Sequence, residues 1–114
     1  MEYQKVEPHW EDAIKEGNLK AALDFLEVEI ALNLCKVHNY FSDNEIRVKD
    51  VYVFALFEEV KDEKKDAFKP FADLNFDFIT ACHGRDDDSP LSSEELIEEF
   101  KEIKKKLEEM MKNI

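Results

Sequence analysis

The side chains best suited to binding a metal are two cysteines and two of the three histidines. Cys35 and His38 are three residues apart, which places them on one face of a helix. Cys82 and His83 are adjacent in the stretch DFITACHGRDDDSP, residues 77–90. Together the four residues have the ligand types of a Cys2His2 zinc site, so their spacing decides whether such a site is expected.

The spacing argues against zinc. Structural zinc sites draw on compact loops with closely spaced cysteines, whereas Cys35 and His38 lie in a strongly apolar stretch. If Cys82 and His83 are helical, their side chains point about 100° apart. Free cysteine is also among the most buried residue types. We predict no metal site and no cofactor. A metal- or thiol-dependent protein that uses these four residues is kept as an alternative.

The sequence also lacks the parts of common enzyme sites. A cysteine nucleophile needs a base within hydrogen-bond reach, and no motif indicates that His38 or His83 meets a cysteine in the fold. Two glycines in the whole chain are too few for a glycine-rich phosphate-binding loop. No Glu-x-x-His pair is present for a di-iron bundle. We therefore predict that the protein is not an enzyme.

The net charge of the chain indicates which class of partner it can bind. The chain has 114 residues and a formal net charge of −12. Such a chain repels phosphate backbones and anionic membrane surfaces, so direct nucleic-acid and membrane binding are disfavoured. A basic protein partner is attracted instead. Aromatic residues make up 11% of the chain, which is typical of a folded domain and not of disorder.

Three features of the sequence bear on where in the cell the protein is located. The start of the chain, MEYQKVEPHW, has neither the basic region nor the apolar region of a signal peptide. No apolar run approaches the length of about 18 residues needed to span a bilayer. Two cysteines are also fewer than a secreted disulfide scaffold carries. We expect a cytoplasmic protein.

The first third of the chain is typical of a helical hairpin. Pro8 suits the first position of a helix, Gly17 a left-handed helix end, and Asn18 the N-cap of the next helix. That second helix is expected over residues 19–40, where apolar residues recur three and four positions apart. So apolar a helix is expected to be central to the fold.

The middle of the chain is ambiguous. Residues 51–57 (VYVFALF) form an apolar run, and residues 74–79 (LNFDFI) alternate, so both could be strands. No hairpin turn signal joins them, and a two-stranded ribbon alone is marginal. We therefore favour helices, with Ser42 or Asp43 as an N-cap and Pro70 kinking or restarting the stretch.

The last helix has the clearest signals. Ser92 and Glu95 have the spacing of a capping box. A narrow apolar seam follows, formed by Leu96, Phe100, Ile103, Leu107, Met110 and Ile114. We expect it to pack within the chain, because it is shorter than the roughly three to four heptads typical of a coiled coil. The preceding helix is expected to end after His83, with Gly84 in the left-handed position.

These patterns predict a mainly α fold, a compact bundle of four to five helices in one domain, residues 1–114. The alternative is an α+β fold with a short strand pair within residues 46–80. The loop and first turns of the last helix carry a negative patch, predicted to bind a partner and formed by Asp86, Asp87, Asp88, Glu94, Glu95, Glu98 and Glu99.

The leading functional hypothesis is a small acidic, non-enzymatic protein-binding module. In its sharpest form it is an immunity- or antitoxin-like inhibitor, or a mimic of nucleic-acid charge, that occludes a basic partner such as a nuclease. The first alternative is a structural or assembly protein that self-associates through the seam of residues 96–114. The sequence leaves both a monomer and a homodimer open.

Overall fold

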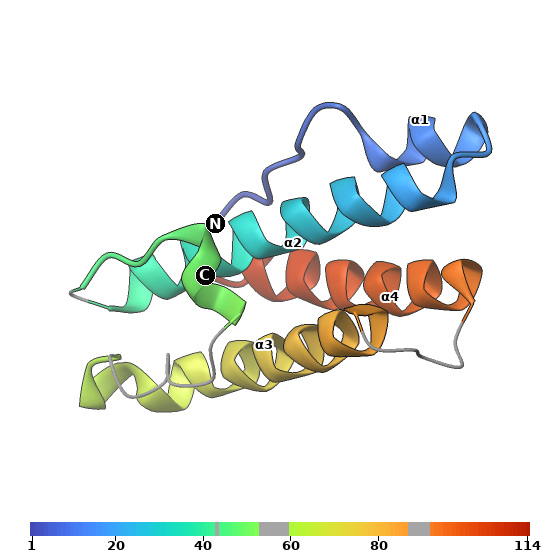
Figure 1. The fold of residues 1–114 in the computed structure, drawn as a ribbon. Helices are drawn as coiled ribbons and strands as arrows, with labels where there is room; N and C mark the ends of the chain where they lie inside the picture. The colour runs from blue at the N-terminus through green and yellow to red at the C-terminus, as the bar shows by residue number, and fades with distance from the viewer. Residues whose placement is uncertain (43, 53–59, 87–91) are drawn as a thin grey trace.

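The computed structural model describes residues 1–42, 44–52, 60–86 and 92–114 (Figure 1). These residues form the helices α1 (Trp10–Lys15), α2 (Leu19–Phe41), α3 (Lys65–Asp86) and α4 (Ser93–Lys112), and the short 3-10 helices η1 (Val48–Tyr52) and η3 (Asp62–Lys64). Strand pairing in the described ranges is limited to one isolated antiparallel bridge, between Ser42 and Val60. The predicted mainly α fold, a compact bundle of four to five helices, is confirmed, with four α-helices in the described residues.

The corner between α1 and α2 has the residues that the sequence predicts. Gly17 has a φ of +77°, in the left-handed region that glycine adopts without steric cost. Asn18 caps α2, because its side-chain oxygen accepts a hydrogen bond from the Ala21 N–H at 3.1 Å. The tight corner lays α1 back along α2 (Figure 1).

The predicted start of α1 is wrong by two residues. Pro8 lies outside the helix, because His9 has an extended backbone with a φ of −84° and a ψ of 137°. His9 is the N-cap instead: its Nδ1 accepts a hydrogen bond from the Glu11 N–H at 3.3 Å. α1 therefore begins at Trp10, whose side chain is buried.

α2 is the central helix, as predicted. It contacts α1, α3, α4 and η1, and α4 lies between α2 and α3 (Figure 1). Burial of each large aliphatic side chain contributes about 1.5–3 kcal/mol to the stability of the fold. The buried apolar residues of α2 are Ala22, Leu23, Leu26, Ile30, Ala31, Leu34, Cys35, Val37 and Phe41.

None of the helices in the described ranges combines the length and apolar character that crossing a bilayer requires.

Residues 1–9 run along α2 before α1 begins (Figure 1). This segment is the strap. At the start of the strap, the Met1 nitrogen donates hydrogen bonds to the carbonyls of Met111 and Ile114, both at 2.8 Å. The two ends of the chain therefore lie together, and the strap spans the distance from the end of α4 to the start of α1.

Ser42 ends α2 and does not start a new helix. Its N–H bonds to the His38 carbonyl at 2.9 Å, and its own backbone is extended, with a φ of −111° and a ψ of 151°. Its hydroxyl oxygen accepts a hydrogen bond from the Asn44 N–H at 3.1 Å. The predicted N-cap at Ser42 is therefore wrong, and the other candidate, Asp43, lies outside the described residues.

The structure favours helix over strand in the middle of the chain. Residues 74–79, one of the two candidate strands, lie inside α3. Of the other candidate, Val51 and Tyr52 belong to η1, and residues 53–57 lie outside the described residues. α3 also runs through Pro70 without restarting there. Helical spacing decides the outcome, because it buries one face of α3, formed by Phe68, Phe71, Leu74, Phe78 and Cys82.

The predicted end of α3 at Gly84 is wrong. Gly84 does not have a positive φ, and the helix continues to Asp86. Arg85 supplies the physical reason, because its guanidinium pairs with Asp24 and lies 3.6 Å from Glu27, both on α2. The three additional helical residues bring the arginine to these carboxylates and tie the end of α3 to α2.

α4 begins as predicted and closes the core. The Ser92 hydroxyl oxygen accepts a hydrogen bond from the Glu95 N–H at 3.2 Å. The seam faces α2 and α3, and packing within the chain is confirmed: Leu96, Phe100, Ile103 and Leu107 are buried, whereas Met110 and Ile114 are partly buried. Ile97 and Met111 add to the buried face. Little of the seam is left for contact with a second chain.

Candidate partner-binding surface

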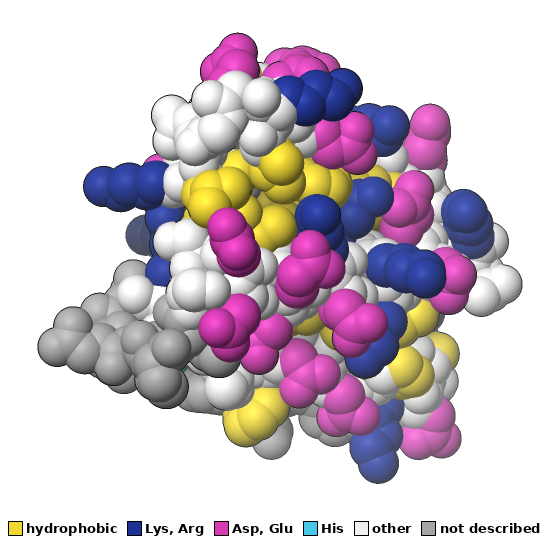
Figure 2. Space-filling view, turned by 90° about the vertical axis from the view of Figure 1, so that its right-hand side faces the viewer, with side chains coloured by type: hydrophobic (Ala, Val, Ile, Leu, Met, Phe, Trp, Pro, Cys, Tyr) yellow, Lys and Arg dark blue, Asp and Glu magenta, His cyan; other side chains and the backbone are white. Residues whose placement is uncertain are grey.

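The predicted acidic patch is exposed where the structure describes it. The first turns of α4 present four exposed carboxylates, those of Glu94, Glu95, Glu98 and Glu99. Asp86 is the last residue of α3, and its side chain lies outside the described residues, as do Asp87 and Asp88. Figure 2 shows the end of the molecule where α4 begins, with acidic side chains spread over much of the surface and hydrophobic side chains between them.

A groove of about 410 Å³ lies between α3 and α4, next to this patch. Its apolar lining comes from Ala81, Leu96 and Ile103, which are all buried in the core. Thr80 and Gly84 complete the α3 side. Gly84 adds no side chain to this part of the lining. A partner that placed an aliphatic side chain here would therefore meet apolar atoms.

Carboxylates rim the groove. Asp77 stands on α3, and Glu99 and Glu102 stand on α4, all with exposed side chains. Within the part of the chain that the structure describes, none of the three has a lysine or arginine nitrogen within 4.0 Å. Lys106 also lines the groove. The rim therefore has a net negative charge and carboxylates that are available to a basic partner.

Two other acidic residues of α4, unlike the rim carboxylates, are paired with lysines. Glu98, on the adjacent face of α4, lies 3.3 Å from Lys101. Glu108 accepts a hydrogen bond from Lys104 at 3.0 Å. Exposed ion pairs contribute only about 0–1 kcal/mol, but each places a cation beside its carboxylate. The rim carboxylates of the groove have no such neighbour, so they present more uncompensated charge than Glu98 does.

Of the two cysteine–histidine pairs, Cys35, His38 and Cys82 are buried in the fold. The thiol of Cys35 lies 3.4 Å from the Ile46 carbonyl oxygen, and the His38 ring packs edge-on against Phe68, with centroids 5.8 Å apart. Both cysteines, Cys35 and Cys82, are buried. His83, the next residue, is exposed. Across the described ranges, no three His, Cys, Asp or Glu side chains are grouped as a metal site requires.

Burial also makes Cys35 a poor nucleophile. It raises the pKa of the Cys35 thiol, although a hydrogen bond from Asn39 lowers it in part. A raised pKa reduces the fraction of thiolate, which is the reactive form of cysteine. Burial and the raised pKa both reduce the reactivity of this thiol.

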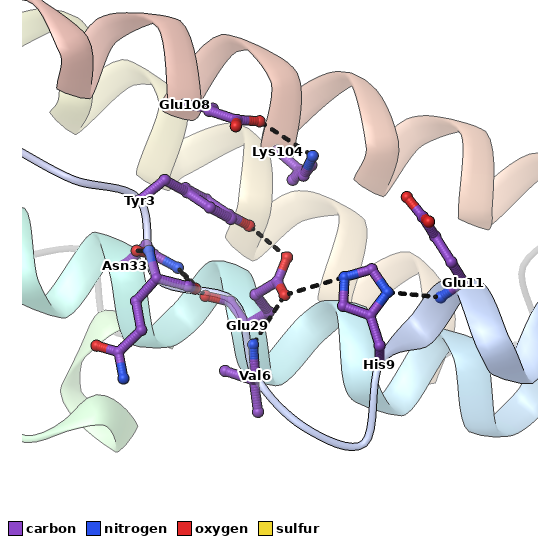
Figure 3. Close-up of polar contacts among 9 residues, drawn as sticks. Tyr3, Val6, His9, Glu11, Glu29, Asn33, Lys104 and Glu108 are labelled. Atoms are coloured by element: carbon purple, nitrogen blue, oxygen red, sulfur yellow. Dashed lines mark hydrogen bonds and ion pairs between the residues drawn. The ribbon is translucent and has the colours of Figure 1, made fainter.

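Sequence reasoning missed a buried polar cluster beneath the strap (Figure 3). Glu29 of α2 is completely buried. Its carboxylate accepts hydrogen bonds from the Tyr3 hydroxyl at 2.7 Å and the Val6 N–H at 3.0 Å, and it lies 4.0 Å from His9 Nε2. Its two oxygens are therefore occupied by the strap, which makes Glu29 an anchor for the strap.

Asn33, one helical turn after Glu29, holds the strap by its backbone. Its side-chain oxygen accepts a hydrogen bond from the Gln4 N–H, and its side-chain nitrogen donates to the Gln4 carbonyl, both at 2.8 Å. The sequence signal was present: two polar residues four positions apart interrupt the apolar face of a central helix. A buried polar pair of this kind needs partners from another segment.

Burial and the hydrogen bond to Glu29 raise the pKa of the Tyr3 hydroxyl well above its usual range. On the opposite side of α2, burial and the nearby Glu27 carboxylate raise the pKa of Tyr52 in the same direction. Both tyrosines are therefore hydrogen-bond donors that tie surrounding segments to α2.

Comparison of this chain with protein-family models, with curated proteins and with solved structures finds no match.

Proposed function

We propose that this chain is an acidic, non-enzymatic protein-binding module whose partner is a basic protein. The observation that carries the proposal is the groove between α3 and α4, which combines an apolar lining with the unpaired carboxylates of Asp77, Glu99 and Glu102. Apolar contact would supply binding energy. The carboxylates would favour basic partners and accelerate association with them.

In the sharpest form of the proposal, the chain is an inhibitor that covers a functional surface of its partner. A nuclease or another protein that binds nucleic acid has a basic surface, and a chain with a net charge of −12 is complementary to it. The exposed carboxylates of Glu94 and Glu95 extend the negative surface beyond the groove along α4. Bound there, the chain would exclude the partner's substrate by steric and electrostatic occlusion.

The alternatives have less support. Self-association through the seam of residues 96–114 would require apolar side chains that are already packed within the chain. A metal- or thiol-dependent activity would require the two cysteine–histidine pairs to act together, and the described residues contain no grouped set of metal ligands. The groove between α3 and α4, by contrast, combines an apolar lining and exposed carboxylates on one surface.

The proposal is tested with two variants of equal charge. The groove variant carries Asp77→Asn, Glu99→Gln and Glu102→Gln. The control variant neutralises three exposed carboxylates of α1 and the adjoining corner, with the substitutions Glu11→Gln, Asp12→Asn and Glu16→Gln. Fluorescence anisotropy measures the affinity of each for a labelled 18-residue peptide of lysine and leucine, at about 50 and 500 mM salt.

The native chain should bind the peptide, and high salt should weaken binding by at least about tenfold. The groove variant should lose about tenfold in affinity at low salt, since three exposed ion pairs together contribute roughly 1–3 kcal/mol. The control variant should bind like the native chain. Equal losses in both variants would show that net charge alone is responsible, which would overturn the proposal.

A further inference from the structure

We propose that the partner segment in the α3–α4 groove is an amphipathic helix, with aliphatic side chains on the apolar lining and lysine or arginine side chains beside the acidic rims. This inference rests on the proposed function and adds to it the conformation and the side-chain pattern of the bound segment. It concerns the same groove and requires no second site.

The groove itself indicates the need for an apolar anchor. Leu96 and Ile103 close the bottom of the groove from α4, and Ala81 closes it from α3. A volume of about 410 Å³ accommodates side chains, not a folded element. A purely charged segment would leave this volume to water, whereas an aliphatic side chain would remove apolar surface from water on both partners.

The backbone of the groove favours a helix over an extended segment. The lining residues belong to α3 and α4, whose backbone N–H and C=O groups are used within the helices. An extended peptide would find no strand edge here to pair with, and its own backbone groups would lose water without gaining partners. A helix satisfies its backbone internally, so it can lie in the groove at no such cost.

The spacing of the carboxylates fits a helix lying along α4. Glu95, Glu99 and Glu102 follow one another at positions i, i+4 and i+7, on one side of the helix. They span about 10 Å along the axis, at 1.5 Å per residue. Basic residues with the same spacing on a neighbouring helix would meet these carboxylates in register, with the anchor side chain on the adjacent face.

Lys106 adds a preference at the end of the groove away from the start of α4. It is exposed and is the lining residue with a positive charge. A partner helix that is basic along its whole length would place a cation against it. The expected partner is therefore basic opposite Glu99 and Glu102 and neutral or acidic opposite Lys106.

The test compares two labelled peptides of identical composition. In the first, the leucines form one stripe with lysines at i, i+4 and i+7 beside it. In the second, the same residues are rearranged so that no apolar stripe forms. Fluorescence anisotropy gives both affinities for the native chain, and circular dichroism reports helix formation by each peptide on binding. The striped peptide should bind at least about tenfold more tightly and become helical.

A chain variant that fills the groove without changing charge supplies the second readout. Thr80→Phe places an aromatic ring at an exposed position of the lining. Ala67→Phe, at an exposed position thirteen residues earlier on α3, is the control. Thr80→Phe should weaken binding of the striped peptide about tenfold, whereas Ala67→Phe should not. Both variants should keep the native helical circular dichroism, since both positions face solvent.

The outcomes separate this inference from the proposed function. If both peptides bind equally and the groove variant weakens both, a basic partner is supported but the amphipathic helix is wrong. If Thr80→Phe has no effect on the striped peptide, the apolar lining is not the contact and the inference also fails. If neither peptide binds the native chain, the inference and the proposed function fail together.

Discussion

The hydroxyl of Tyr3 donates a 2.7 Å hydrogen bond to Oε2 of Glu29, twenty-six positions later in the chain. The other oxygen of the same carboxylate accepts from the Val6 N–H and faces His9. A carboxylate that is completely buried costs several kcal/mol unless such donors surround it. The burial of Glu29 in the central helix therefore requires the strap, and the position of the strap requires Glu29.

Glu29→Ala should destabilise the fold by about 2–4 kcal/mol, because the Tyr3 hydroxyl and the Val6 N–H lose their acceptor while the strap still covers them. Urea unfolding followed by circular dichroism measures the change. Glu16→Ala, at an exposed glutamate, should change the free energy of unfolding by less than about 0.5 kcal/mol. A loss at Glu29 as small as that at Glu16 would contradict the anchoring role.

Asn33→Ala should release the strap locally. The Gln4 N–H loses the oxygen that accepts its hydrogen bond, so its amide hydrogen should exchange faster with solvent by at least about tenfold. Hydrogen–deuterium exchange read by NMR measures the effect at Gln4, and amides in the middle of α4 serve as the reference. Unchanged exchange at Gln4 would show that Asn33 does not hold the strap.

The two tyrosines with raised pKa values predict the response to alkaline pH. The folded state holds their phenolic protons more tightly than the unfolded chain, where the pKa of tyrosine is about 10. Their stabilising effect is therefore complete below about pH 10 and is lost as the pH rises above it. The free energy of unfolding should fall between about pH 10 and 12, and fall less steeply in Tyr3→Phe and Tyr52→Phe.

Tyr40→Phe is the matched control for alkaline unfolding, because Tyr40 is 54% exposed. This variant should show the same decline as the native chain. The pH dependence is obtained from urea unfolding at several pH values. If Tyr3→Phe and Tyr52→Phe declined as steeply as the native chain, the two buried hydroxyls would not be responsible for the decline.

The buried seam makes a prediction about α4. Phe100 and Leu107 have no exposed surface, so Phe100→Ala and Leu107→Ala should each cost about 3–5 kcal/mol. Phe100→Glu should unfold the chain, because it places an unpaired charge in the core. Size-exclusion chromatography with circular dichroism distinguishes the alternatives. A folded, monomeric Phe100→Glu variant obtained from a dimeric native chain would instead support self-association through the seam.

Local signals were sufficient to predict much of the fold. Gly17 and Asn18 act on their immediate neighbours, and Ser92 caps α4 from three residues away. The apolar spacing of α2 and α4 depends only on helical periodicity. These features were predicted correctly because each depends on interactions between residues that are a few positions apart in the chain.

Long-range contacts decided the parts that the sequence did not reveal. α3 continues past Gly84, and Arg85 in its last turn meets Asp24, sixty-one positions earlier in the chain. The strap follows from Glu29 pairing with Tyr3, which no local pattern shows. Of the groove rim, the predicted patch contained Glu99 but neither Asp77 nor Glu102. Those two join Glu99 only through the packing of α3 against α4.

The most direct test of the proposed partner-binding surface is an NMR titration of the isotope-labelled chain with the striped lysine–leucine peptide. We predict that amide shifts concentrate on the groove, at Thr80, Ala81, Glu99 and Ile103, and that the Thr80→Phe variant needs about tenfold more peptide to reach the same shifts. Shifts spread evenly over the acidic surface, or centred on α1, would contradict a binding site between α3 and α4.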